Sequence, residues 1–159
     1  MLQSGSYQAH PHKIALIGNY LPRRCGIATF TTDLVTALAK ENPEGECWAV
    51  VMNDVPEGYR YPPQVRFEVN QRLLVDYRLA ADFLNMNRVE VVCLQHEFGI
   101  FGEEYGAHVL DLLSNLRMPL VTTLHTVLQE PDPGQRAMIK RIAKLSDRLV
   151  VMSQRAKQI

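Results

Sequence analysis

The segment NYLPRRCGIATF joins a short apolar run to an amphipathic run, and its residue types suit an anion. Arg23 and Arg24 supply formal positive charge, and Gly26 allows close approach of a ligand to the backbone. If a helix begins here, the N–H groups of Ile27 and its successors point out of an N-terminus that carries partial positive charge. A phosphate or carboxylate group is then the expected ligand. A tight turn with two solvated arginines is the alternative, and the residues alone favour neither.

Two further segments place histidines directly after apolar runs. LQHEFGIFGEEYGAH carries His96 and Glu97, and PLVTTLHTVL carries His125 followed by Thr126. Histidine can donate or accept a hydrogen bond with a sugar hydroxyl, and it titrates near neutrality. A metal site would need a third ligand, and no close H-x-H or H-E-x-x-H spacing in the His96 segment supplies one.

A packed histidine with no functional role is the alternative at each of these positions. We favour that alternative for His108, and for His10 and His12 near the amino terminus. His125 is the histidine for which we favour a functional role, because it ends an apolar run that would lie in the centre of a sheet.

Six apolar runs predict strands, several of them continuously apolar, as is typical of strands buried on both faces. They are Ile14–Ile17, Cys47–Met52, Val65–Val69, Val89–Leu94, Leu120–Leu124 and Arg148–Met152. Between them, helical periodicity gives four apolar faces. These faces are Phe30/Leu34/Ala37/Leu38, starting at about Thr29, then Tyr77/Ala80/Ala81/Leu84, Val109/Leu112/Leu113/Leu116 and Met138/Ile142/Leu145. Asp132 before Pro133 predicts an N-cap for the last helix.

This alternation predicts an α/β fold: a Rossmann-like, doubly wound, mainly parallel sheet of about six strands with helices on both faces. Ligands of such sheets bind beyond the carboxyl ends of the strands, where all three polar segments would lie. We expect residues 1–12 to be a disordered lead-in and residues 13–159 to form one domain. The closing QRAKQI would be a one-turn helix, so we expect the natural chain to continue.

Composition narrows the function classes. The 159 residues contain 47% apolar and 21% charged residues, with 17 basic and 17 acidic side chains. This balance gives no reason to expect a nucleic-acid partner. The segment MLQSGSYQAHPHK lacks an apolar signal core, and three cysteines at wide spacing form no disulfide framework, so we expect a cytoplasmic protein. The first polar segment matches neither G-x-G-x-x-G nor the P-loop ending G-K-[ST].

From about Lys13 to Gln158, the sequence resembles the N-terminal domain of a family 4 (group 1) retaining glycosyltransferase of the GT-B fold. The resemblance rests on IGNYLPRRCGIATF, LQHEFGIFG, VTTLHT and SDRLVVMSQRA. It implies an N-terminal domain that holds the acceptor and a C-terminal domain, absent from this chain, that holds the nucleotide-sugar donor. The donor-side E-x7-E pattern of the family is not found here.

The resemblance also implies roles for particular residues. His125 matches the family's histidine that contacts the donor sugar near the reacting centre, and is the catalytic candidate. Four residues would form the donor or phosphate loop: Arg23, Arg24, Gly26 and Ile27. Four would contact the acceptor: His96, Glu97, Phe98 and Gly99. Cys25 replaces the first glycine of the family's Gly-Gly pair, which would be unfavourable if that position required a positive φ.

The implied activity is transfer of a sugar from a nucleotide-sugar to a sugar or lipid-linked acceptor with retention of configuration, and no metal or other cofactor is expected. A lipid-linked acceptor would bring the protein to the inner face of the membrane. We expect the 159-residue chain alone to be inactive and to self-associate through the surface that its second domain would cover. Two alternatives stay open: a freestanding Rossmann-like module that binds an anionic ligand, and, less favoured, a metal-dependent hydrolase using His96, Glu97 and His125.

Overall fold

The computed structural model describes residues 10–158 and contains one six-stranded sheet in which every pairing of neighbouring strands is parallel. The strands are β1 (Lys13–Gly18), β2 (Glu46–Asn53), β3 (Val65–Asn70), β4 (Val91–His96), β5 (Leu120–Leu124) and β6 (Arg148–Val151). Their order across the sheet is β3-β2-β1-β4-β5-β6. The order reverses between β1 and β4, and the carboxyl ends of these strands therefore flank the crevice where such sheets bind ligands.

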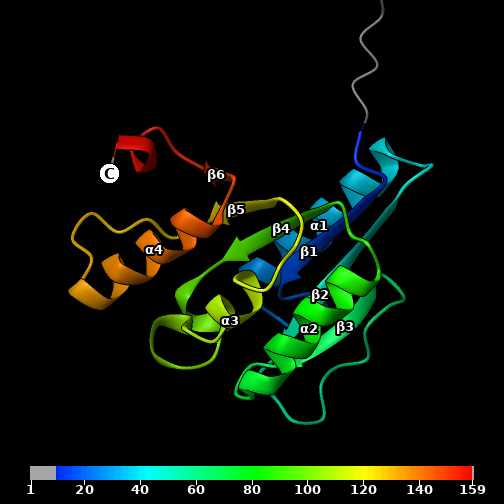
Figure 1. Cartoon of the computed structure of the whole chain (residues 1–159), viewed down its shortest axis with the longest axis horizontal. Helices are drawn as coiled ribbons and strands as arrows, with labels where there is room; N and C mark the ends of the chain where they lie inside the picture. The colour runs from blue at the N-terminus through cyan, green and yellow to red at the C-terminus, as the bar shows by residue number, and fades with distance from the viewer. Residues whose placement is uncertain (1–9, 159) are drawn as a thin grey trace, which may run out of the picture.

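Four α-helices cover the two faces of the sheet (Figure 1). They are α1 (Gly26–Glu41), α2 (Leu74–Met86), α3 (Val109–Leu113) and α4 (Pro133–Leu145), with short 3-10 turns at Phe98–Ile100, Glu104–Gly106 and Ala156–Gln158. Helix α1 packs on one face in a small apolar cluster that includes Leu16 and Val35. The larger core lies on the other face, where α2, α3 and α4 pack together. Within residues 10–158, no helix is long and apolar enough to cross a bilayer.

The predicted Rossmann-like fold is confirmed, and all six predicted strands are present. One strand begins later than predicted, at Val91 instead of Val89. The reason is that the Val89 N–H still donates to the Leu84 carbonyl of the preceding helix, and Arg88 turns the chain with a φ of 54°. The chain therefore joins the sheet only after this turn.

The predicted buried face of the first helix is only partly correct. Leu34 and Leu38 are partly buried and pack against the apolar cluster beneath the helix, but Phe30 and Ala37 are exposed. The fully buried residues of the helix are Ala28, Thr31 and Val35, and the small side chains of Ala28 and Thr31 let its first turns approach the sheet closely. The helix also begins at Gly26, three residues before the predicted start.

The other helical predictions fare better. The stripe on α2 is buried as predicted: Tyr77, Ala80, Ala81 and Leu84. Asp132 caps α4 in a capping box with Gln135, and Pro133 is the first residue of that helix. The ends of two predicted stripes differ, since Leu116 lies beyond the end of α3 and Leu145 is 37% exposed.

The last residues of the predicted lead-in are hydrogen-bonded to the domain. The His12 carbonyl accepts a 2.6 Å hydrogen bond from the Glu46 N–H, and the Pro11 carbonyl accepts one of 2.9 Å from Asn42. These bonds hold the chain at the amino end of β1 before the strand starts. Residues 1–9, which the prediction also covered, lie outside the described residues.

Candidate functional site

The loops that follow β1, β4 and β5 meet at the carboxyl edge of the sheet, as the sequence predicted. Strands β4 and β5 are direct neighbours, and His96 pairs with Leu124 in their register. The Phe30 ring of α1 packs edge-to-face on the His125 ring, with centroids 4.7 Å apart. The N-terminal turns of α1 and the loop after β5 therefore form one surface, although they are distant in the sequence.

His125 is half-buried in this surface and is held by a polar partner. Its Nε2 lies 3.0 Å from Oε1 of Gln95, the penultimate residue of β4. Partial burial lowers the pKa of His125, and the nearby Glu97 carboxylate opposes this effect. The imidazole is therefore neutral at pH 7. With the Gln95 oxygen facing Nε2, that nitrogen carries the hydrogen and Nδ1 is left as an acceptor.

Glu97 connects the loops after β4 and β5. Its carboxylate accepts a hydrogen bond from the Phe98 N–H at 3.0 Å and another from the Thr126 hydroxyl. These two bonds fix the turn that carries Phe98 and Gly99. Gly99 is exposed, and a Cβ built there would meet nothing within 4 Å, so this part of the loop is open to a ligand.

His96, in contrast, is sealed inside the protein. Its side chain is fully buried, with the Phe98 ring edge-on at 5.1 Å and the Phe101 ring stacked at 6.0 Å between centroids. Neither ring nitrogen has a hydrogen-bond partner within residues 10–158. Burial lowers the pKa of His96 to about 4, helped by the neighbouring His125. The structure therefore places His96 beneath the candidate site and not on its surface.

The two adjacent arginines have different environments. The Arg23 guanidinium donates to the Asn19 side chain at 3.1 Å and to the Met52 carbonyl at 2.8 Å, and it pairs with Asp54 at 3.4 Å. Its side chain is only 11% exposed, so it braces the loop after β1. Arg24 is exposed beside the start of α1, which makes it the arginine of the pair that can reach a ligand.

The first turn of α1 presents backbone N–H groups at the same edge. Cys25 is the N-cap, and its Sγ accepts a hydrogen bond from the Ala28 N–H at 3.3 Å. Its φ of −158° is ordinary extended backbone, so the absence of the family's first glycine causes no strain. Within residues 10–158, the N–H groups of Gly26 and Ile27 donate to no protein acceptor. A Cβ at Gly26 would face open space, so an anion can approach these amides.

Sequence reasoning missed Gln95 as a member of the site. Strand side chains alternate between faces, so Gln95 lies on the face opposite His96, under α1. It is fully buried, its Oε1 holds His125, and its Nε2 has no partner within the described residues. The available signal in the sequence is a glutamine that ends the apolar run VVCLQ, directly before His96.

The carboxyl end of β2 carries polar side chains that are bound to one another. The Asn53 amide donates to Glu68 at 2.7 Å, and its oxygen accepts from the Tyr61 hydroxyl at 2.8 Å. Asp54 accepts from the Tyr59 hydroxyl at 2.8 Å. We call these five residues the β2 network. Among residues 10–158, no group of three or more His, Cys, Asp or Glu side chains is arranged to hold a metal ion.

Comparison with known proteins assigns neither a family nor a function to the chain. No protein-family model matches the sequence, and no curated protein matches it. Among solved structures, a homoserine dehydrogenase from S. aureus aligns over 87% of this chain with a TM-score of 0.44 and 9% identity. The chain spans about a third (31%) of the length of that dehydrogenase.

Proposed function

We propose that this chain is the N-terminal, acceptor-side domain of a retaining glycosyltransferase that uses a nucleotide-sugar donor. The observation that supports this most is the meeting of three elements at the switch point of the sheet. These are the uncapped amides of Gly26 and Ile27, the neutral His125 held by Gln95, and the open turn that follows Glu97. Sequence motifs that resemble the glycosyltransferase family lie on the same three loops.

In this proposal each element has a task during sugar transfer. The N-terminus of α1, with Arg24 beside it, stabilises the negative charge that develops on the departing diphosphate. His125 accepts a hydrogen bond from a hydroxyl of the donor sugar through Nδ1, which holds the sugar with its anomeric carbon toward the acceptor. The Glu97–Thr126 hydrogen bond keeps the acceptor-side turn, with Phe98 and Gly99, in position.

The second wall of the site would come from a donor domain. Only one side of the proposed cleft is built from residues 10–158, and the diphosphate would be held mainly by the second domain. We therefore predict that the 159-residue chain alone turns over no nucleotide-sugar.

The test starts from the native protein. The protein is isolated from its source cells with an antibody, its intact mass is measured, and release of nucleoside diphosphate from UDP-, GDP- and ADP-sugars is followed. We expect a native chain about twice the length of this one and measurable release. His125→Ala in that chain should lower the rate at least about 100-fold, which is typical of loss of a group at the reacting centre.

The matched control is His12→Ala, since the His12 side chain is exposed at the opposite edge of the sheet. It should leave the rate unchanged. A native protein of 159 residues that releases no diphosphate, even with cell extract added, would overturn the proposal.

The second candidate is a freestanding module that binds an anionic ligand without catalysis. The free amides at the start of α1 favour it, because they need no second domain to attract an anion. The module would bind inorganic pyrophosphate as the isolated chain, and Arg24→Gln would weaken that binding while Arg117→Gln, at the other edge of the sheet, would not.

A further inference from the structure

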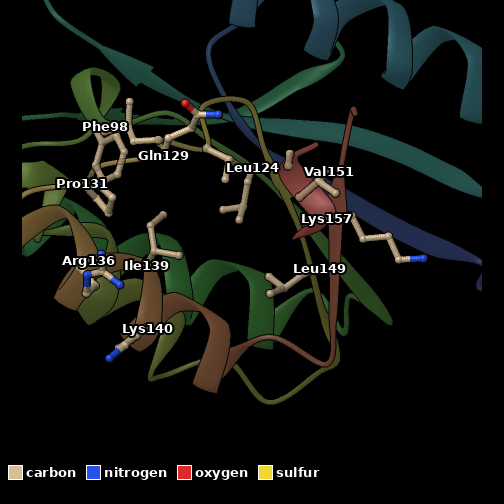
Figure 2. A pocket seen from close by; sticks show the side chains of 13 residues that line it. Phe98, Leu124, Gln129, Pro131, Arg136, Ile139, Lys140, Leu149, Val151 and Lys157 are labelled. Atoms are coloured by element: carbon tan, nitrogen blue, oxygen red, sulfur yellow. The ribbon is translucent and has the colours of Figure 1, made fainter. Parts of the chain in front are cut away.

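A groove lies between α4, β6 and the loop after β5, next to the candidate site (Figure 2). It has a volume of about 630 Å³, within the range of about 300–1,000 Å³ typical of small-molecule sites. It shares Phe98 with the candidate site but contains neither His125 nor the first turn of α1. Phe98 is the one lining residue of the groove to which the proposed function gives a task.

The interior of the groove is apolar. Leu124 and Ile139 point into it from β5 and α4, and Leu149 points into it from β6 (Figure 2). Leu149 is 46% exposed, which is unusual for a leucine that lies beside three other apolar side chains. Burying these side chains against a ligand would be favourable, because apolar surface would leave water.

The rim of the groove is positively charged. Arg136 and Lys140 stand on one side, along α4, and Lys157 stands on the other (Figure 2). No aspartate or glutamate lines the groove. Within residues 10–158, none of the three cations forms an ion pair. An anionic group at the rim would therefore gain favourable contacts without displacing an existing partner.

We propose that this groove binds a small anionic amphiphile, a molecule with an apolar chain and a phosphate or carboxylate at one end. The chain would lie against Leu124, Ile139 and Leu149, and the anion would lie at the rim beside Arg136 and Lys140 of α4. Charge complementarity favours this occupant over a second copy of the protein, which is formally neutral with 17 basic and 17 acidic residues. The site would exist whether or not the chain takes part in sugar transfer.

The test uses the 159-residue chain and dodecyl phosphate below its critical micelle concentration. Binding is measured by titration calorimetry, and the site is located by NMR shifts of the Ile139 and Leu149 methyl groups. The double variant Arg136→Gln/Lys140→Gln removes two exposed rim charges and should weaken binding roughly 3- to 10-fold, as expected for exposed charge pairs. Leu149→Glu places a carboxylate inside the groove and should weaken binding more than about 10-fold.

The matched control is Arg141→Gln/Lys144→Gln, which removes two cations of α4 that do not line the groove. It should bind dodecyl phosphate as the unmodified chain does, and the neutral dodecyl maltoside should bind more weakly to both. If Leu149→Glu does not fold, the variant Arg136→Gln/Lys140→Gln still tests the proposed binding. Both of its substituted residues are exposed, so it should fold.

Several results would overturn the proposal. They are no binding, equal affinity for the neutral and anionic probes, an equal loss in the control variant, or methyl shifts elsewhere. A stable dimer seen by light scattering, which Leu149→Glu converts to monomer, would show that a second copy covers the groove instead. Release of nucleotide from sugar donors plays no part in these measurements, so their failure would leave the proposed glycosyltransferase function untouched.

Discussion

Two polar regions lie at the same edge of the sheet and differ in how their hydrogen-bonding groups are used. In the β2 network, Asn53 bonds to Glu68 and Tyr61, Asp54 bonds to Tyr59, and Arg23 pairs with Asp54. At the carboxyl end of β4, the buried side chains of Gln95 and His96 retain polar atoms without a partner in the described chain. The polar side chains of the first region are therefore paired with one another, and those of the second are only partly paired.

The difference shows why residue type alone does not identify a site. An Asp, a Glu and two tyrosines at the end of β2 offer as much chemistry as the histidines at the ends of β4 and β5. Dinucleotide-binding sheets use an acidic residue at the end of this strand for ribose. Here that position is occupied by side chains that satisfy one another.

Gly102→Ala should destabilise the protein by about 3 kcal/mol, because the new Cβ would lie 1.8 Å from the Gln71 carbonyl oxygen. Gly99→Ala, three residues earlier in the same loop, should change stability by less than about 0.5 kcal/mol, since its Cβ would meet open space. Urea unfolding of both variants measures this. Equal losses of stability in the two variants would contradict this description of the loop after β4, in which Gly99 is open to solvent and Gly102 is packed against Gln71.

Acidification should destabilise the protein through His96. Folded His96 has a pKa of about 4, and the ordinary value is 6.5. Between these two pH values the unfolded chain therefore binds a proton at His96 and the folded chain does not. The stabilisation that comes from burying neutral His96 is fully present above about pH 6.5, and it is lost as the pH falls toward 4. Relative to His96→Phe, the unmodified chain should lose roughly 2–3 kcal/mol between pH 7.5 and pH 4.5.

Denaturant titrations of both proteins at the two pH values provide the measurement. Phenylalanine suits a site lined by Phe98 and Phe101, so this variant should fold. Parallel pH profiles for the two proteins would show that His96 is charged or hydrated in solution, and the contrast with the β2 network would then fail.

The histidines also show how far the sequence could lead. Continuous apolar runs predicted all six strands and the order of elements, because strands buried on both faces need no information from elsewhere in the chain. The placement of both histidines at neighbouring strand ends followed from that pattern. The sequence pattern did not show which of the two histidines is buried. That depends on Phe98 and Phe101, whose rings pack over His96 on one face of β4.

Long-range contacts set the other limits of sequence reasoning. Arg23 and Arg24 are indistinguishable in the sequence, and the contacts of Arg23 with the Met52 carbonyl and Asp54, about 30 residues away, decide which one is bound. The exposed half of the predicted α1 face has a related explanation. Phe30, which looks like a core residue, lies against His125, which belongs to a loop 95 residues further along the chain.

Arg23→Gln should destabilise the protein by about 2 kcal/mol, because the partly buried Met52 carbonyl and Asp54 lose a charged donor. Arg24→Gln should change stability by less than about 0.5 kcal/mol, because Arg24 is exposed and its side chain forms no hydrogen bond or ion pair within residues 10–158. The same variant should weaken pyrophosphate binding by the isolated chain. Thermal unfolding and calorimetry separate the two arginines, and a stability loss shared by both would contradict the assignment.

The smallest effects come from removing one hydroxyl in each region. Tyr61→Phe should cost about 1 kcal/mol, because it leaves the Asn53 oxygen unpaired in a closed network. Thr126→Val should cost only a few tenths of a kcal/mol, because water can reach the half-buried Glu97 carboxylate and replace the lost bond. Urea unfolding of the two variants, measured side by side with the unmodified chain, separates the two losses of stability. A larger loss for Thr126→Val than for Tyr61→Phe would reverse the comparison, since the β4–β5 region would then depend on its internal hydrogen bonds as the β2 network does.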